Sequence, residues 1–279
     1  MKAIMWNSVI FQIHNDTCRH LLVSVVSFTG SEYVGRVVGK NVASRFGKSI
    51  LELGGNNGIY GNFCYSNKLI LNLSLASIIM PDADLSLAVP SVFFGAVGTA
   101  GQRCTSTRRL YLHSSIAHEF LERLQELYKS VKPGDPLVDG TLMGPLHSRT
   151  ACNTYSNAIQ HLRSSGAEIL TGGNKYNQTP LNSGNFVEPT IAIPKSGIPN
   201  DTIWKTETFA PILNVAIFDE LKQAIHWNNS VPQVGARPVS VAMLYLWCNH
   251  NRDYQAVCGL GTLEILGNGL VQTAQILAL

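Results

Sequence analysis

Charge is scarce in this sequence. Only 14% of its 279 residues are Asp, Glu, Lys or Arg, and the formal net charge is +3. No run of basic residues accompanies this small positive charge, so electrostatics excludes nucleic acid and anionic membranes as expected partners. Hydrophobic residues make up 45% of the chain, which is enough for the core of one large or two ordinary domains.

The six cysteines lack the spacing of a metal site. There is no Cys-x-x-Cys pair and no cluster of Cys and His at the spacing of zinc ligands. We therefore expect no metal, and free thiols in a reducing compartment. The cytoplasm is the expected location, with the mitochondrion as the alternative.

Long apolar runs and a secretory leader are also missing. The runs at residues 21–28 and 69–80 are shorter than the about 20 residues that cross a bilayer. Both are therefore predicted to be buried strands or core. The apolar stretch at residues 9–11 is followed at once by polar residues, which predicts that no signal peptide is cleaved.

The front of the chain has the pattern of a β-α-β unit. Residues 21–28 are rich in Val and predict a strand. Ser31 is a suitable N-cap for a helix whose apolar stripe ends with Val42 and Phe46, before Gly47. Residues 49–53 predict a second buried strand. Two strands joined through a helix imply a parallel sheet with a right-handed crossover.

This unit carries only a weak nucleotide signal. The helix start behind Gly30 exposes amides that suit a phosphate. However, the sequence has no G-x-G-x-x-G, and a P-loop ending at Lys48-Ser49 fails because Val42 occupies the position of its first glycine.

The rest of the chain alternates helices and strands, which indicates an α/β fold. The clearest helix begins at Ser114 or Ser115 and ends before Pro133, with its charged residues on the solvated face. Asp219 is a candidate cap for the last helix. The other predicted elements are an apolar stretch from Asp82 and Asp84 to Phe94, a helix through residues 151–162, strands at 108–113, 168–170, 186–193 and 212–218, and a helix at 221–227.

Cys104 and Glu52 are the candidate chemical pair, each beside a glycine-bearing turn. A cysteine acts as a nucleophile in its thiolate form, which a helix start, amides or a cation favours, and Arg103 is a candidate cation. Taken alone, Cys104 could equally be a buried structural thiol and Glu52 a strand-end carboxylate that caps a turn.

Five short motifs occur in an order that resembles the NAD(P)-dependent aldehyde dehydrogenase family. The detailed sequences of these motifs are similar to those of the antiquitin, or alpha-aminoadipic semialdehyde dehydrogenase, branch of that family. The resemblance covers about residues 23–229. The motifs are SFTGS at 27–31, LELGGNN at 51–57, GTAGQRC at 98–104, EPT at 188–190 and TETFAP at 206–211.

The resemblance implies a role for each matching residue. Cys104 would be the nucleophile and Glu52 the general base, acting in separate steps through a thiohemiacetal and a thioester. Of the remaining residues, Gly30 and Ser31 would bind the NAD pyrophosphate, Glu207 and Phe209 the nicotinamide ribose and ring, and Arg103 the substrate carboxylate.

Each of the last three residues keeps a simpler interpretation. Arg103 could be a turn arginine that faces water. Glu207 could be a surface carboxylate, and Phe209 a core aromatic.

The resemblance also implies a partial aldehyde dehydrogenase fold. We expect a remnant β-α-β unit of the NAD-binding domain at residues 21–53 and an α/β catalytic domain at 54–229, after an unassigned segment at 1–20. The family's N-terminal half and closing segment are missing. The 52 positions between Glu52 and Cys104 (104 − 52) exceed the family spacing through an insertion at about 60–80, and residues 230–279 form a divergent tail.

Two functions remain open. The first is NAD-dependent oxidation of a semialdehyde, a small-molecule substrate, to a carboxylic acid. The second is an inactive fragment that serves as a structural or subunit-binding module. Either form is expected to associate with itself or with a full-length subunit of the family, because a sheet cut to one β-α-β unit leaves open edges.

Overall fold

The computed structural model describes residues 17–54, 59–61, 76–177, 181, 184–195, 202–230, 262–266 and 269–273. The chain forms two compact units, Met1–Gly54 and Gly55–Leu279. Among the described residues, no helix is both long and apolar enough to span a bilayer.

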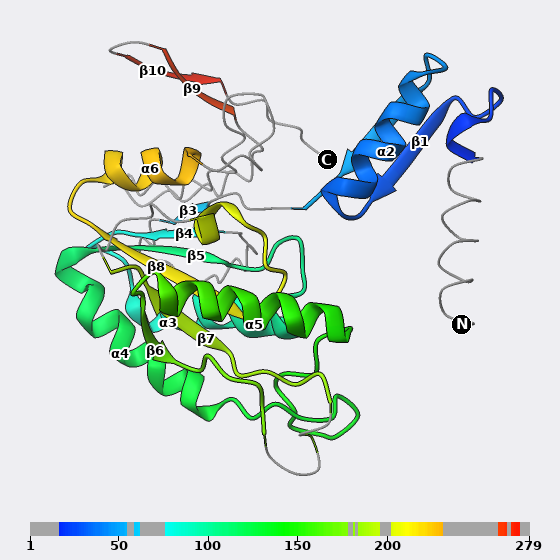
Figure 1. The fold of residues 1–279 in the computed structure, drawn as a ribbon. Helices are drawn as coiled ribbons and strands as arrows, with labels where there is room; N and C mark the ends of the chain where they lie inside the picture. Colours follow the sequence, from blue (N-terminus) through cyan, green and yellow to red (C-terminus); the bar gives the residue numbers. More distant parts are fainter. Residues whose placement is uncertain are drawn as a thin grey trace. The chain divides into compact units, whose positions relative to one another are not determined.

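Unit 1 is a β-α-β unit, as predicted (Figure 1). Strand β1 (Val25–Thr29) and strand β2 (Lys48–Glu52) are parallel, with Thr29 opposite Glu52. Helix α2 (Glu32–Ala43) joins them, and the predicted N-cap is confirmed because the Ser31 hydroxyl accepts a hydrogen bond from the Val34 amide. The α2 residues Val38 and Val42 are buried against the sheet.

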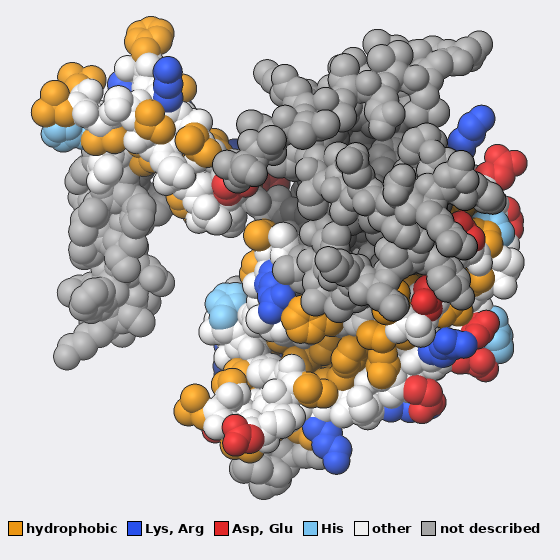
Figure 2. Space-filling view, turned by 180° about the vertical axis from the view of Figure 1, so that it is seen from behind, with side chains coloured by type: hydrophobic (Ala, Val, Ile, Leu, Met, Phe, Trp, Pro, Cys, Tyr) orange, Lys and Arg blue, Asp and Glu red, His pale blue; other side chains and the backbone are white. Residues whose placement is uncertain are grey.

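Several predictions for unit 1 were wrong. The strand begins at Val25, and the preceding Leu21 and Leu22 are 80% and 88% exposed. Phe46 is fully exposed in a turn after α2, and β2 is largely exposed. A two-stranded sheet with one helix buries only one face, so apolar residues elsewhere stay at the surface of this unit (Figure 2).

Unit 2 is built on a six-stranded sheet with strand order β3-β4-β5-β8-β7-β6. All neighbours are parallel except β6 and β7, which are antiparallel. The strands are β3 (Ile59–Gly61), β4 (Ala76–Ile79), β5 (Arg109–His113), β6 (Glu168–Thr171), β7 (Thr190–Ile193) and β8 (Ile212–Phe218). Two further strands, β9 (Thr262–Leu266) and β10 (Gly269–Thr273), form a separate antiparallel pair.

Helices cover this sheet, which confirms the α/β fold class (Figure 1). They are α3 (Leu85–Val97), α4 (Ser114–Ser130), α5 (Arg149–Ser164) and α6 (Leu221–Asn229). The central strands β5 and β8 are almost entirely buried, and Phe120 and Leu124 of α4 are fully buried in the same core. Burial on both faces explains why the sequence of β8 is an apolar run broken only by Asn214.

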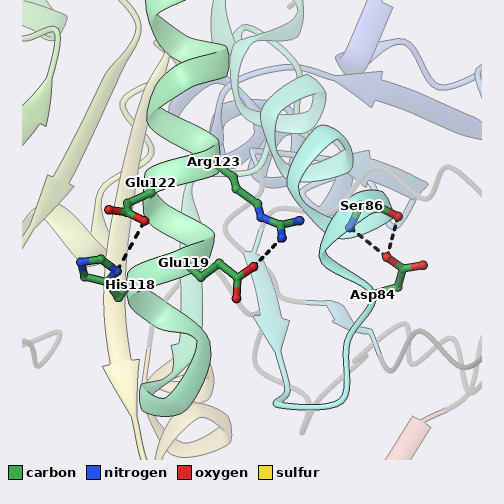
Figure 3. Close-up of polar contacts among 6 residues, drawn as sticks. All are labelled: Asp84, Ser86, His118, Glu119, Glu122 and Arg123. Atoms are coloured by element: carbon green, nitrogen blue, oxygen red, sulfur yellow. Dashed lines mark hydrogen bonds and ion pairs between the residues drawn. The ribbon is translucent and has the colours of Figure 1, made fainter.

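Local signals set the helix ends. Asp84 caps α3 by accepting hydrogen bonds from the Ser86 hydroxyl (2.6 Å) and amide (2.8 Å), which lower the pKa of the Asp84 carboxyl (Figure 3). The charged residues of α4 lie on its solvated face, as predicted, and some form ion pairs four residues apart, such as Glu119 with Arg123.

Two predicted boundaries differ from the structure. Asp219 does not cap α6, because its carboxylate accepts a hydrogen bond from the Ser114 hydroxyl at 2.6 Å, and Glu220 and Gln223 form the capping box instead. Strand β7 begins at Thr190 and not at residue 186, since Pro189 has no amide to donate to a neighbouring strand.

The Tyr155 hydroxyl ties α5 to the segment that leads into β7. It donates to the Glu188 carbonyl at 2.8 Å and lies 2.9 Å from the Thr190 hydroxyl. Burial raises the pKa of Tyr155 to about 12. The segment is thereby held by hydrogen bonds between buried polar groups.

We expect Tyr155→Phe to lower the free energy of unfolding by about 1–3 kcal/mol, because it removes the buried hydrogen bonds of the Tyr155 hydroxyl. The matched control is Tyr128→Phe. Tyr128 is also buried, but among the described residues none hydrogen-bonds its hydroxyl, so its loss should be close to neutral. Urea unfolding of both variants checks this, and equal losses would contradict it.

Candidate functional site

A left-handed turn presents Cys104 at the end of α3. Thr99, Ala100 and Gly101 have consecutive positive φ values of 53°, 54° and 67°. Gly101 is required by sterics as well as by φ: a Cβ there would lie 2.4 Å from the Ala210 carbonyl oxygen and 2.8 Å from the Pro211 nitrogen. The turn therefore packs directly against the segment that precedes β8.

Gln102 anchors the same turn on its other side. Its side-chain nitrogen donates to the carbonyls of Thr99 (3.2 Å) and Pro145 (3.3 Å), and its side-chain oxygen accepts from the His147 amide at 2.9 Å. Held in this way, Cys104 is exposed, whereas Cys18 and Cys152 are buried. The interpretation of Cys104 as a buried structural thiol is therefore wrong.

Arg108 joins the cysteine turn to the Glu207–Phe209 segment. Its guanidinium donates to the Arg103 carbonyl (2.7 Å) and the Ser106 carbonyl (3.2 Å) and forms an ion pair with Glu207 at 3.2 Å. It also lies over the Phe209 ring, 5.3 Å from the ring centroid, within the range of a cation–π contact. The Arg108 side chain is only 3% exposed.

The electrostatics follow from this geometry. Burial lowers the pKa of Arg108, while Glu207 first and Cys104 second act to raise it. The positive charge of Arg108 thus lies close to both Cys104 and the half-buried Glu207 carboxylate. Within the described ranges, no cluster of three or more His, Cys, Asp or Glu forms a metal site.

Phe209 and Glu207 belong to the irregular segment between the short 3-10 helix Thr202–Lys205 and β8. Phe209 has a φ of 49°, an uncommon value for a bulky residue, which marks a tightly constrained backbone. Both side chains are partly exposed. Neither is simply a core aromatic or a surface carboxylate, since each contacts Arg108.

Arg103 is half-buried, with its guanidinium 5.4 Å from the ring centroid of Phe94. Its amide donates to the Ser106 hydroxyl at 3.0 Å, which closes the turn around Cys104. It therefore does not simply face water.

Arg108 was predicted only as the first residue of a strand and not as part of the site. One signal was available: a charged residue at the start of a buried strand needs a partner, and here it follows directly behind the cysteine motif.

The predicted site residues of unit 1 gather at one end of its sheet. Glu52 ends β2, and Gly30 and Ser31 follow β1, so all three lie at the carboxyl ends of the parallel strands. The Gly30 amide donates to the Glu52 carbonyl at 3.0 Å. The Glu52 side chain is exposed. The structure therefore assembles two groups, one in each unit.

We expect Gly101→Ala to destabilise the chain by about 3 kcal/mol, since it combines an unfavourable φ with a clash against backbone. Gly140→Ala is the control. Gly140 has a φ of 84°, but a Cβ there would meet nothing within 4 Å, so only the conformational cost, about 1 kcal/mol, should remain. Thermal unfolding distinguishes the two, and a Gly101→Ala loss no larger than that of the control would contradict the close packing.

Comparison with known proteins agrees with the motifs. Residues 11–60 and 68–236 match the aldehyde dehydrogenase family. The chain is 48% identical over 211 residues to aldehyde dehydrogenase family 7 member A1 of Pisum sativum, covering 76% of this chain and 37% of that protein. It is 44% identical over 212 residues to alpha-aminoadipic semialdehyde dehydrogenase of Mus musculus, covering 76% of this chain and 35% of that protein.

Solved structures show the same fold. Betaine aldehyde dehydrogenase of Staphylococcus aureus in complex with NAD+ is 29% identical with a TM-score of 0.65, over 78% of this chain and 39% of that one. An apo structure of a point mutant of that enzyme gives a TM-score of 0.67 at 29% identity, over 77% and 39% of the two chains. The chain thus spans less than half the length of these relatives, and it belongs to the aldehyde dehydrogenase family.

Proposed function

We propose that this chain carries out the NAD-dependent oxidation of a semialdehyde to a carboxylic acid. The observation that carries the proposal is the exposed Cys104 on a turn that Arg108 joins to Glu207 and Phe209. The similarity to alpha-aminoadipic semialdehyde dehydrogenase supports a semialdehyde as the substrate class.

Cys104 and Glu52 divide the chemistry between them. The Cys104 thiolate attacks the aldehyde carbon, forming a C–S bond and a thiohemiacetal, which becomes a thioester when it loses a hydride. The Glu52 carboxylate then takes a proton from water as the water attacks the thioester. The C–S bond breaks, the acid leaves and the thiolate is restored.

The residues present fit a dinucleotide. When bound, NAD would act as the oxidant by accepting the hydride. Gly30 and Ser31 lie at the start of α2, where helix amides suit a pyrophosphate. A Cβ on Gly30 would lie 2.6 Å from the Phe28 ring, so the lack of a side chain at this position avoids a clash. The Glu207 carboxylate can accept hydrogen bonds from ribose hydroxyls, and Phe209 offers a flat apolar face. The NAD+ complex of the Staphylococcus aureus relative supports this cofactor.

Arg103 is proposed to bind the carboxylate of the semialdehyde. It precedes the nucleophile directly, and its stacking on Phe94 of α3 holds the guanidinium plane without using its hydrogen-bond donors. A planar fork of donors matches a carboxylate in two parallel hydrogen bonds.

One observation favours the alternative, a chain that binds other family subunits without turning over. The described sheet of unit 1 has two strands, and Val25 and Ile50 on it are 45% and 54% exposed. Parallel sheets are usually covered on both faces, so this unit is expected to need a further layer.

The test is NADH formation from a semialdehyde by the full chain and two variants. Cys104→Ser should abolish both single and multiple turnovers, a loss of about a thousandfold or more. Glu52→Gln should release about one NADH per chain and then slow by about a hundredfold, because the thioester forms but water is not activated. Stopped-flow absorbance separates the burst from the steady state.

Each outcome decides between the two functions. Activity that survives Cys104→Ser would contradict the nucleophile, and a Glu52→Gln variant without a burst phase would contradict the assignment of the base. A folded wild-type chain that forms no NADH and shows no NAD binding by calorimetry would contradict the proposed oxidation and favour the inactive alternative.

A further inference from the structure

Arg108 contacts both halves of the unit 2 site through one side chain. On one side, its guanidinium donates to the carbonyl of Arg103, the residue that precedes Cys104, and to the Ser106 carbonyl two positions after it. On the other side, it pairs with Glu207 and lies over Phe209. The two segments are about a hundred residues apart in the chain, so no local interaction could fix their register.

Hydrogen bonds to two carbonyls constrain the backbone around the nucleophile. Arg103 and Ser106 also bond to each other, through the Ser106 amide (3.1 Å) and the Ser106 hydroxyl (3.0 Å). The guanidinium therefore caps a turn that has Cys104 at its exposed side. Because the guanidinium is rigid and planar, it fixes directions as well as distances.

The adjacent Arg109 provides a natural comparison. It is 1% exposed, yet it bonds to the Tyr111 hydroxyl (3.0 Å) and the Asn228 carbonyl (3.2 Å), away from the cysteine turn. Successive residues of a strand point to opposite faces of the sheet, which explains the difference. The two arginines share burial but not partners.

We propose that Arg108 is the positioning residue of this site: its guanidinium fixes the peptide groups around Cys104 and holds them in register with Glu207 and Phe209. This inference rests on the proposed function only in naming Cys104 as the nucleophile and Glu207–Phe209 as the cofactor segment. Arg108 touches no reacting atom itself; it acts through the turn and through its charge.

The charge of Arg108 gives a readout that a purely structural role would not affect. Iodoacetate and iodoacetamide both alkylate a thiolate, but only iodoacetate is an anion. We therefore use the ratio of the iodoacetate rate to the iodoacetamide rate at Cys104. The thiolate fraction and the accessibility of the sulfur cancel in this ratio, so it reports the local electric field. A guanidinium next to the turn raises this ratio, and the Glu207 carboxylate lowers it.

The experiment measures both alkylation rates on the Cys104 peptide by mass spectrometry, and amide hydrogen exchange over residues 101–108, in the full chain. Arg108→Gln should lower the rate ratio by about threefold and speed exchange of the turn by about tenfold. Arg108→Lys should keep the ratio but not the slow exchange, since lysine keeps the charge and loses the planar fork.

Arg109→Gln is the matched control for removing a buried guanidinium and should change neither readout. Arg103→Gln tests the other nearby cation: a ratio that falls with Arg103→Gln and not with Arg108→Gln overturns the proposal. So does turn exchange in Arg108→Gln that equals exchange in Arg109→Gln.

Should Arg108→Gln fail to fold, Glu207→Gln decides. Glu207 is partly exposed, and Glu207→Gln should raise the rate ratio by about threefold. An unchanged ratio overturns the proposal. These measurements use neither NAD nor aldehyde. A chain that fails to oxidise aldehydes can therefore still confirm the role of Arg108, and the failure of one claim is distinguishable from the failure of the other.

Discussion

Burying a guanidinium is costly unless its charge and its hydrogen-bond donors find partners, and the partners of the Arg108 terminal nitrogens are groups of the site itself. Two carbonyls of the cysteine turn and the Glu207 carboxylate surround it. Taking the charge out of water is unfavourable unless these partners are held in place. Arg108 therefore stabilises the turn, the Glu207–Phe209 segment and the start of β5 together.

Backbone geometry and packing also hold the cysteine turn in place. Three residues with positive φ reverse the chain after α3, and the missing side chain of Gly101 lets the turn reach the Ala210 carbonyl. Gln102 then fixes the turn to the loop at Pro145 and His147. An exposed thiol on a firmly held backbone is the arrangement that nucleophilic catalysis requires, because reactivity needs access while selectivity needs a fixed direction.

The sequence predicted what depends on nearest neighbours. Helix α4, whose apolar residues recur at helical spacing, and strand β8, an apolar run broken only by Asn214, were both predicted closely, and the Ser31 cap followed from local chemistry. Predictions that needed distant partners were wrong or absent. Asp219 does not cap α6 but accepts a hydrogen bond from Ser114, 105 positions away. Leu21 and Phe46 are exposed because the described sheet of unit 1 has only two strands. Arg108 shows the same limit, because nothing near it in the chain indicates Glu207.

The ion pair between Arg108 and Glu207 is tested by a double-mutant cycle. The free energies of unfolding of Arg108→Gln, Glu207→Gln and the double variant would be compared with that of the wild-type chain in urea. We expect a coupling energy of about 1–3 kcal/mol, because each partner satisfies the other in a mostly buried setting. A coupling energy indistinguishable from zero would contradict it, since the cysteine turn and the Glu207–Phe209 segment would then be held independently of each other.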